Sequence, residues 1–153
     1  MNLLFRGSVS ISSILTDDGN VVESAAVSQP LSAAASNVHW QGAGTVAAGA
    51  LEVLDLRSLP QEAFGDEGTV GFSQVHAVYL RNTGTVDIKL GEWEKLVGST
   101  DGTGHLPIRP GGLLVLTAPA ASGLAVAAGD SLSITNASSA EAGFEILIVG
   151  VRA

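Results

Sequence analysis

Apolar and polar residues alternate with a period of two along most of the chain, which is the pattern of strands half-buried in a β-sheet. Between Ser8 and Leu15, for example, Val9 and Ile11 fall on one face and serines on the other. This run stops at the Asp-Asp-Gly-Asn sequence of residues 17–20, a strong turn signal. The alternating segment Val21 to Ser28 follows, so the first thirty residues predict a β-hairpin.

The same alternation continues through the rest of the chain, where clusters of Gly, Asn, Asp and Pro separate the strands. The expected strands are Asn37 to Ala47, Ala50 to Leu56, Thr69 to Ser73, Val75 to Arg81, Thr85 to Leu90, Leu113 to Thr117, Ser131 to Asn136 and Phe144 to Val151. The last of these is apolar at nearly every position. We therefore expect it in the middle of a sheet, with both of its faces covered.

The connections between these strands differ in length and character. Arg57 to Gly68 is a long excursion with a Pro and two Gly, and we expect one helical turn within it at Leu59 to Phe64. Asn-Thr-Gly at Asn82 to Gly84 predicts a short hairpin connection, and Pro-Gly-Gly at Pro110 to Gly112 predicts a turn before an apolar strand.

This series of strands predicts one all-β domain over residues 1–153, a two-sheet antiparallel sandwich of about eight to ten strands. A jelly roll is the preferred topology, because the connections are uneven in length and the last strand is expected to be central. Residues 1–7 precede the first strand and are expected to form an extended arm.

The charge of the chain argues against several classes of partner. Fifteen acidic and seven basic residues give a net charge of −8, and no cluster of Lys or Arg is present that could neutralise a row of phosphates. The apolar start of the chain is only five residues long, far short of a signal peptide or a membrane span. We expect a soluble protein that binds neither nucleic acid nor membrane and is not exported.

Charged residues are only 14% of the chain and apolar residues 46%, so a monomer would expose much apolar and small-residue surface. Such surfaces commonly contact another chain, and we therefore expect a stable homo-oligomer, a trimer. The alternative is a compact sandwich with Ser, Thr and Gly in its loops. The chain has no cysteine, which excludes disulfides and thiol chemistry.

The histidines do not indicate a metal site. His39, His76 and His105 lie in separate segments without the short spacing of a local ligand set. We expect His76 on the surface of a strand, His39 beside Trp40, and His105 in a loop. No metal or cofactor is therefore predicted.

Catalytic motifs are also missing. Glu92 and Glu94 flank Trp93, but carboxylates at this spacing point to one face of a strand and form a solvated pair. The acids at residues 17–20 and Asp101 are interpreted as turn formers, not calcium ligands. The glycine-rich segment of residues 98–104 lacks the Gly-Lys-Ser/Thr ending of a phosphate loop, and no Gly-x-Ser-x-Gly elbow is present. We do not expect an enzyme.

Several segments together resemble a known group of proteins. They are Leu-Asp-Leu-Arg-Ser-Leu at Leu54 to Leu59, the run from Phe72 to Gly84, the run from Ile108 to Pro119, Ser131 to Ser138, and Phe144 to Gly150. Their order resembles that of small β-sandwich proteins of tailed phages, the head decoration or cement proteins. The resemblance covers residues 51–153, about two thirds of the chain.

The resemblance implies a trimer of jelly rolls that sits on the outer surface of a phage head, contacts the major capsid protein and stabilises the shell. It is an argument from analogy, because fold alone does not specify function. The residues expected to contact partners are Leu3, Leu4, Phe5, Trp40 and Trp93. Leu3, Leu4 and Phe5 are included because no partner strand for them is evident in the sequence.

Two other classes of function stay open. A carbohydrate- or receptor-binding module of a phage tail or fibre would need Trp40, Tyr79 and Trp93 exposed as a platform for sugars. A cupin- or lyase-type enzyme would need clustered His and Glu ligands, which the sequence does not place together.

Overall fold

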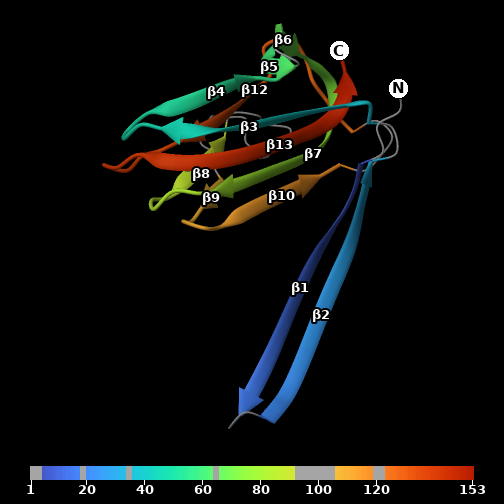
Figure 1. The fold of residues 1–153 in the computed structure, drawn as a ribbon, viewed down its shortest axis with the longest axis vertical. Coiled ribbons are helices and arrows are strands. Elements are labelled where there is room, and N and C mark those ends of the chain that lie inside the picture. Colours follow the sequence, from blue (N-terminus) through green and yellow to red (C-terminus); the bar gives the residue numbers. More distant parts are fainter. Residues whose placement is uncertain (1–4, 18–19, 34–35, 64–65, 92–105, 119–122) are drawn as a thin grey trace.

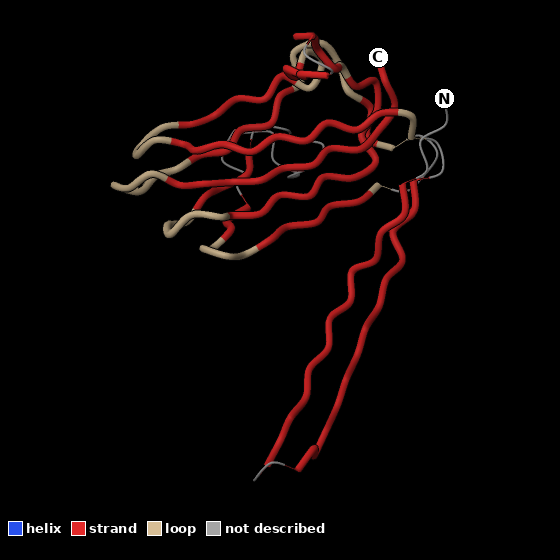
Figure 2. Tube along the Cα trace, in the orientation of Figure 1, coloured by secondary structure: helices blue, strands red, loops and turns tan. Residues whose placement is uncertain are grey.

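The computed structural model describes residues 5–17, 20–33, 36–63, 66–91, 106–118 and 123–153. These residues form strands and connecting turns, with no helix among them (Figures 1 and 2). Accordingly, the described part of the chain contains no helix long and apolar enough to cross a membrane.

Two antiparallel sheets face each other in the upper part of Figure 1 and form a sandwich. The five-stranded sheet has the order β10 (Leu113–Thr117), β7 (Phe72–Asn82), β13 (Ala142–Arg152), β3 (Val38–Val46), and β11 (Leu124–Ala125) also pairs with β7. The four-stranded sheet has the order β4 (Leu51–Asp55), β12 (Ser131–Thr135), β8 (Ile88–Gly91), β9 (Leu106–Ile108). The predicted two-sheet antiparallel sandwich is confirmed.

The core lies between these sheets and is filled by alternate residues of their strands. On β13, Phe144, Ile146 and Ile148 are buried, whereas Glu145 on the opposite face is exposed. The facing sheet contributes fully buried side chains that include Leu90, Leu132 and Ile134. Strand β13 lies between β7 and β3 along most of its length, so the prediction of a central last strand is confirmed.

The segment between β4 and β7 differs from the sequence prediction. Instead of a helical turn at Leu59 to Phe64, strand β5 (Leu59–Ala63) pairs with β6 (Asp66–Val70) in a small antiparallel hairpin. Leu59 lies opposite Val70, and both side chains are buried in the core. The helical prediction was wrong because pairing across the hairpin buries both of these apolar residues at once.

The connection at Asn82 to Gly84 was also mispredicted. It leads from β7 in the five-stranded sheet to β8 in the four-stranded sheet, so it crosses between sheets and does not close a hairpin. The Asn82 side-chain amide is buried and donates hydrogen bonds to the carbonyl oxygens of Val86 (2.7 Å) and Ile108 (2.9 Å). Its side-chain oxygen accepts one from the Gly84 amide (2.9 Å), which fixes the crossing. The turn before β10 is confirmed, with Gly111 at a φ of 72°.

A second buried asparagine joins two loops at one end of the sandwich. The Asn136 side-chain nitrogen donates to the carbonyl oxygens of Val46 (2.9 Å), Ala47 (3.2 Å) and Ala140 (2.7 Å). Its side-chain oxygen accepts from the backbone nitrogen (3.0 Å) and the hydroxyl (2.6 Å) of Ser138. The turn after β3 is therefore held against the turn between β12 and β13 by one side chain.

A long two-stranded ribbon projects from the sandwich in Figures 1 and 2. It consists of β1 (Phe5–Asp17) and β2 (Asn20–Ala33), which pair antiparallel along their whole length with a register shift between Leu15 and Thr16. The predicted N-terminal hairpin is confirmed and is longer than expected. We call this element the ribbon.

The arm expected over residues 1–7 is placed only in part. Residues 1–4 lie outside the described residues, and Phe5 begins β1 opposite Ala33 of β2. The expectation that Phe5 lacks a partner strand was therefore wrong. The free end of the ribbon is its turn after Asp17, whereas Phe5 lies at its base near the sandwich.

Candidate interaction surface

The two faces of the ribbon differ sharply in composition. By strand alternation and the pairing register, one face carries the odd-numbered residues of β1 up to Leu15 and their partners on β2. Its apolar members are Phe5, Val9, Ile11, Leu15, Ala25, Val27, Leu31 and Ala33, and it also carries Gly7, Ser13, Glu23 and Gln29. The opposite face carries Arg6, Ser8, Ser10, Ser12 and Ile14 with their partners Ser32, Pro30, Ser28, Ala26 and Ser24. One face is therefore mainly apolar by sequence, and we call it the ribbon's apolar face.

A two-stranded ribbon of this kind is incomplete as a structural unit. Isolated hairpins are marginally stable in water, and they become stable when a third strand joins or when their apolar face packs against another element. Within the described residues, β1 and β2 form a sheet of two strands only. The ribbon therefore has two free edges and one apolar face available for contact with another chain.

The sandwich also has a free edge, along β3. This strand pairs with β13 on one side and with no described strand on the other. Edge strands are usually protected from pairing by charged residues, prolines or bulges. Strand β3, with the sequence Val-His-Trp-Gln-Gly-Ala-Gly-Thr-Val, contains no Lys, Arg, Asp, Glu or Pro, and its pairing with β13 has no register shift. The uncharged composition of residues 38–46 is a signal that the sequence analysis overlooked.

The outer face of the five-stranded sheet carries apolar side chains as well. Leu147 lies opposite Tyr79, and Tyr79 lies opposite Val115, so three half-buried residues form a row across β13, β7 and β10. Leu113, at the start of β10, is 58% exposed. An ion pair between the half-exposed side chains of Arg81 and Glu145 (3.8 Å) borders the row. A pair this exposed contributes little to stability.

Of the five residues expected to contact partners, the structure describes two. Leu3, Leu4 and Trp93 lie outside the described residues, and Phe5 lies at the ribbon base. Trp40 is only 6% exposed, and its indole nitrogen donates a hydrogen bond to the Pro60 carbonyl oxygen (2.6 Å). Its ring covers Gly42, where a Cβ atom would lie 2.4 Å from the ring. Trp40 therefore belongs to the core, which corrects its place among the partner-binding residues.

The aromatic platform required for sugar binding is not assembled by the residues that the structure places. Trp40 is buried, and Tyr79 lies half-buried in the row on the five-stranded sheet. The third expected member, Trp93, lies outside the described residues together with its neighbours Glu92 and Glu94.

Two segments that the sequence analysis considered for metal or phosphate binding lie outside the described residues. The glycine-rich segment of residues 98–104 and His105 are not described. Among the residues that are described, no three or more His, Asp or Glu side chains form a group that could hold a metal ion.

The two described histidines have different environments. His39 is exposed on edge strand β3, next to Trp40 in sequence, whereas His76 on β7 is only 2% exposed. The prediction that His76 lies on a strand surface was wrong. On β13, Val149 pairs with Ala77 and the next residue, Gly150, pairs with Val75, so His76 is the extra residue of a β-bulge.

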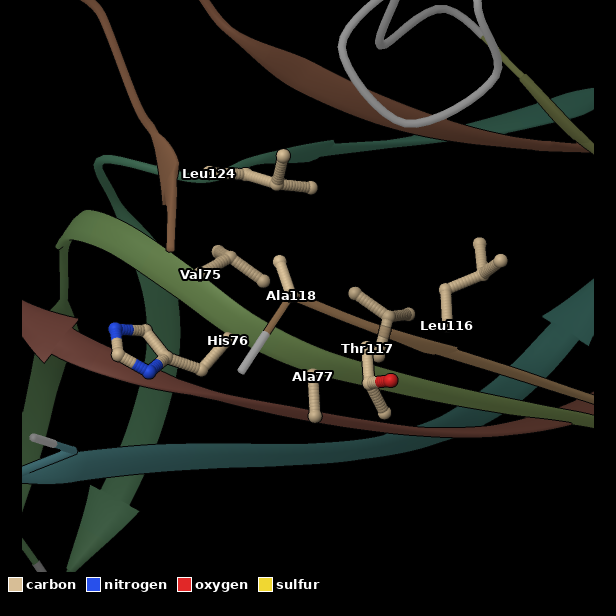
Figure 3. A pocket seen from close by; sticks show the side chains of 8 residues that line it. Val75, His76, Ala77, Leu116, Thr117, Ala118 and Leu124 are labelled. Carbon is tan, nitrogen blue, oxygen red and sulfur yellow. The ribbon is translucent and has the colours of Figure 1, made fainter. Parts of the chain in front are cut away.

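His76 lines a cavity of about 180 Å³ between β7, β10 and β11, with Leu116, Thr117 and Leu124 among its other walls (Figure 3). The His76 carbonyl accepts a hydrogen bond from the Ala118 amide (2.7 Å). Among the residues that the structure describes, neither ring nitrogen of His76 has a hydrogen-bond partner. A Cβ atom at Gly123 would lie 2.6 Å from the ring, so only a glycine leaves room for the imidazole there.

We expect the substitution His76→Leu to raise the free energy of unfolding by about 1 kcal/mol. Burial of unpaired polar atoms costs about 1–3 kcal/mol, and leucine removes both ring nitrogens while keeping an apolar side chain in place. Urea unfolding measures the change, with His39→Leu on the exposed edge as the control that leaves stability unchanged. A loss of stability would contradict the cost assigned here to the unpaired imidazole.

Comparisons with known proteins give no relative from which a role could be transferred. No protein family, curated protein or solved structure matches the chain.

Proposed function

We propose that the protein is a structural component of a tailed-phage virion, a decoration or cement protein that binds the outer surface of the head. In this proposal it stabilises the shell through protein–protein contacts with the major capsid protein, and it acts without a cofactor or turnover. The projecting ribbon is the observation that carries the proposal.

The ribbon is suited to attachment because it projects from the sandwich and its register gathers most of its apolar residues on one face. The register places Val9, Ile11, Val27 and Leu31 on this face, and the two strands that carry them project from the sandwich in Figure 1. Burying one such side chain in an interface contributes about 1.5–3 kcal/mol. A few of them on one face are enough to anchor the protein on a shell where many copies of the binding site are present.

The strand order supports the jelly-roll part of the proposal. Apart from the short β11, the sheets have the orders β3-β13-β7-β10 and β4-β12-β8-β9. The chain passes from one of these sheets to the other at β3 to β4, β4 to β7, β7 to β8, β9 to β10, β11 to β12 and β12 to β13. Eight strands interleaved between two sheets are typical of jelly rolls, which occur in viral capsid proteins and in lectins. The fold is therefore compatible with the virion role and with the glycan-binding alternative, and the ribbon favours the former.

We expect changes on the ribbon's apolar face to weaken attachment to shells. The double variant Ile11→Ser, Val27→Ser alters one cross-strand pair of that face. It should lower the affinity for empty heads of the source phage at least tenfold, because each 1.4 kcal/mol lost corresponds to a factor of ten. Deletion of residues 1–7, which removes three pairs at the ribbon base, should also weaken attachment while the sandwich stays folded.

The matched control is Ser10→Ala, Ser28→Ala, which changes the neighbouring pair on the opposite face. Co-sedimentation with the heads measures occupancy, and thermal unfolding verifies that each variant is folded. Unchanged occupancy of the Ile11 and Val27 variant would refute the role of the ribbon. No sedimentation of the unaltered protein with heads, combined with retention on a glycan array, would replace the proposal with the carbohydrate-binding one.

A further inference from the structure

We infer that the free edge of β1 pairs with the free edge of β3 in a second copy of the chain. Neither of these two edges has a neighbour among the described strands, and one backbone contact between copies would pair both. The contact is a β-augmentation, in which main-chain hydrogen bonds join a strand of one protein to the sheet edge of another.

The β3 edge is open along its nine residues. On the face of β3 turned away from the core, His39, Gln41, Ala43 and Thr45 are all exposed, and no described strand lies beside them in the five-stranded sheet. The other three edges of the two sheets are less suited to pairing with a further strand. Strand β4 carries Glu52 and Asp55, β9 contains Pro107, and β10 is only five residues long.

Within the ribbon, β1 is the better edge for pairing. Strand β2 contains Pro30, which has no N–H to donate, and prolines in sheets are confined to edges that stay unpaired at that position. Strand β1 contains no proline, and between Arg6 and Asp17 it has no charged residue. Pairing would also give the ribbon the third strand that isolated hairpins lack.

The two edges match in length and in pattern. At about 3.3 Å per residue, nine residues of β3 span about 30 Å and thirteen residues of β1 about 43 Å, so the ribbon covers the whole edge. In the paired arrangement, Ser8, Ser10 and Ser12 fall on the same side of the extended sheet as Gln41 and Thr45 of β3. The apolar residues of β1 then fall on the side of the sheet that faces the core. Strand β3 and the residues of β1 between Arg6 and Asp17 contain no Asp, Glu, Lys or Arg, which matters for copies that each carry a net charge of −8.

The partner strand comes from another copy because of where the ribbon leaves the sandwich. Strand β2 ends at Ala33 and β3 begins at Val38, and from this junction the ribbon points away from the sheet (Figure 1). Its own β1 therefore lies away from its own β3. A contact between two different surfaces is heterologous, and such contacts form rings when the rotation between copies closes and open filaments when it does not. The pairing is compatible with the trimer expected from composition.

Cysteine cross-linking tests this pairing directly, because the chain has no cysteine of its own. The single variants Ala43→Cys on β3 and Ser8→Cys, Ser10→Cys or Ser12→Cys on β1 are purified separately, mixed in the full-length protein and oxidised. Since each chain carries one thiol, a covalent pair joins two copies. We expect a dimer band from Ala43→Cys with at least one of the three serine variants, and none with the control Ser139→Cys, which is exposed in the turn between β12 and β13.

Other cross-linking patterns would overturn the inference. A covalent dimer from Ala43→Cys alone would mean that two β3 edges pair with each other. A dimer from the serine variants alone would mean that ribbons pair with ribbons. A lack of cross-linking in every mixture would exclude the contact.

The oligomeric mass gives a second, independent readout. In light scattering at micromolar concentration, Ala43→Lys should convert the oligomer to a monomer, because a lysine on an edge strand opposes pairing. The control Val53→Lys, at an exposed position on edge strand β4, should leave the mass unchanged. A monomeric unaltered protein would overturn the inference, whereas shell binding by that monomer would leave the proposed function standing.

Discussion

Replacing Gly150 by alanine is expected to lower the free energy of unfolding by about 3 kcal/mol, the upper end of the usual cost of overpacking. A Cβ atom at Gly150 would lie 2.0 Å from the Gln74 carbonyl oxygen and 3.0 Å from the Phe72 ring. Gly150 follows the register shift at which β13 passes the bulge of His76 on β7. Because the obstructing atom belongs to the backbone, relief requires the two central strands of the sheet to move apart.

The control for this substitution is Gly44→Ala on β3. There a Cβ atom would meet only the Phe144 ring at 3.4 Å, an ordinary contact distance. We expect a change of less than about 0.5 kcal/mol, as for substitutions away from special features. Chemical denaturation of both variants measures the difference, and equal stabilities would show that the strands around Gly150 can separate at low cost.

The substitution Ile148→Ala is expected to lower the free energy of unfolding by about 2–5 kcal/mol, the range found for large-to-small changes in protein cores. Ile148 is fully buried on β13, and this strand pairs with β7 and β3 on its two sides. Neighbours on both sheets therefore surround the cavity that the change would create. Pairing on both sides limits how far the backbone can move to fill that cavity.

A matched comparison is Leu147→Ala, one residue earlier on the same strand. Leu147 faces outward and is only half-buried, so the same kind of truncation should cost clearly less. Thermal unfolding of the two variants measures the difference in stability cost between the buried and the outward-facing position. An unchanged melting temperature for Ile148→Ala would contradict the central place of β13 in the core.

Local features of the sequence were enough to predict the strands and two of the turns. The hairpin of β1 and β2 follows from alternation on both sides of the turn signal at residues 17–20, and both features act over a few residues. The central place of β13 was inferred from the apolar run between Phe144 and Val151, and the strand does pair on both sides. The expected cover on both faces is not found, because Glu145 is exposed and Leu147 is half-buried on the outer face. These predictions succeed because turns depend on residues that are close in sequence, and because burial of an apolar run requires only that some core is present.

The candidate interaction surface was predictable only in part. The sequence indicated that the N-terminal region contacts other chains, and the ribbon is the element found there. The predicted lack of a partner strand for Phe5 and the predicted partner contact of Trp40 were not borne out. Phe5 pairs with Ala33, twenty-eight residues away, and the Trp40 indole donates a hydrogen bond to the Pro60 carbonyl oxygen in the hairpin of β5 and β6. A periodic pattern shows that a residue faces one side of a strand. It does not show which distant residues cover that side.

By itself, the sequence determined the all-β class, the positions of most strands and the low charge that favours contact with other chains. Only the tertiary structure decided that the chain crosses between sheets at Asn82 to Gly84, that His76 is buried at a bulge, and that β3 is left at an open edge. The physical reason is the same in each case. Strand formation depends on local alternation, whereas the choice of sheet, the register and the position of an edge depend on pairing between segments far apart in the chain.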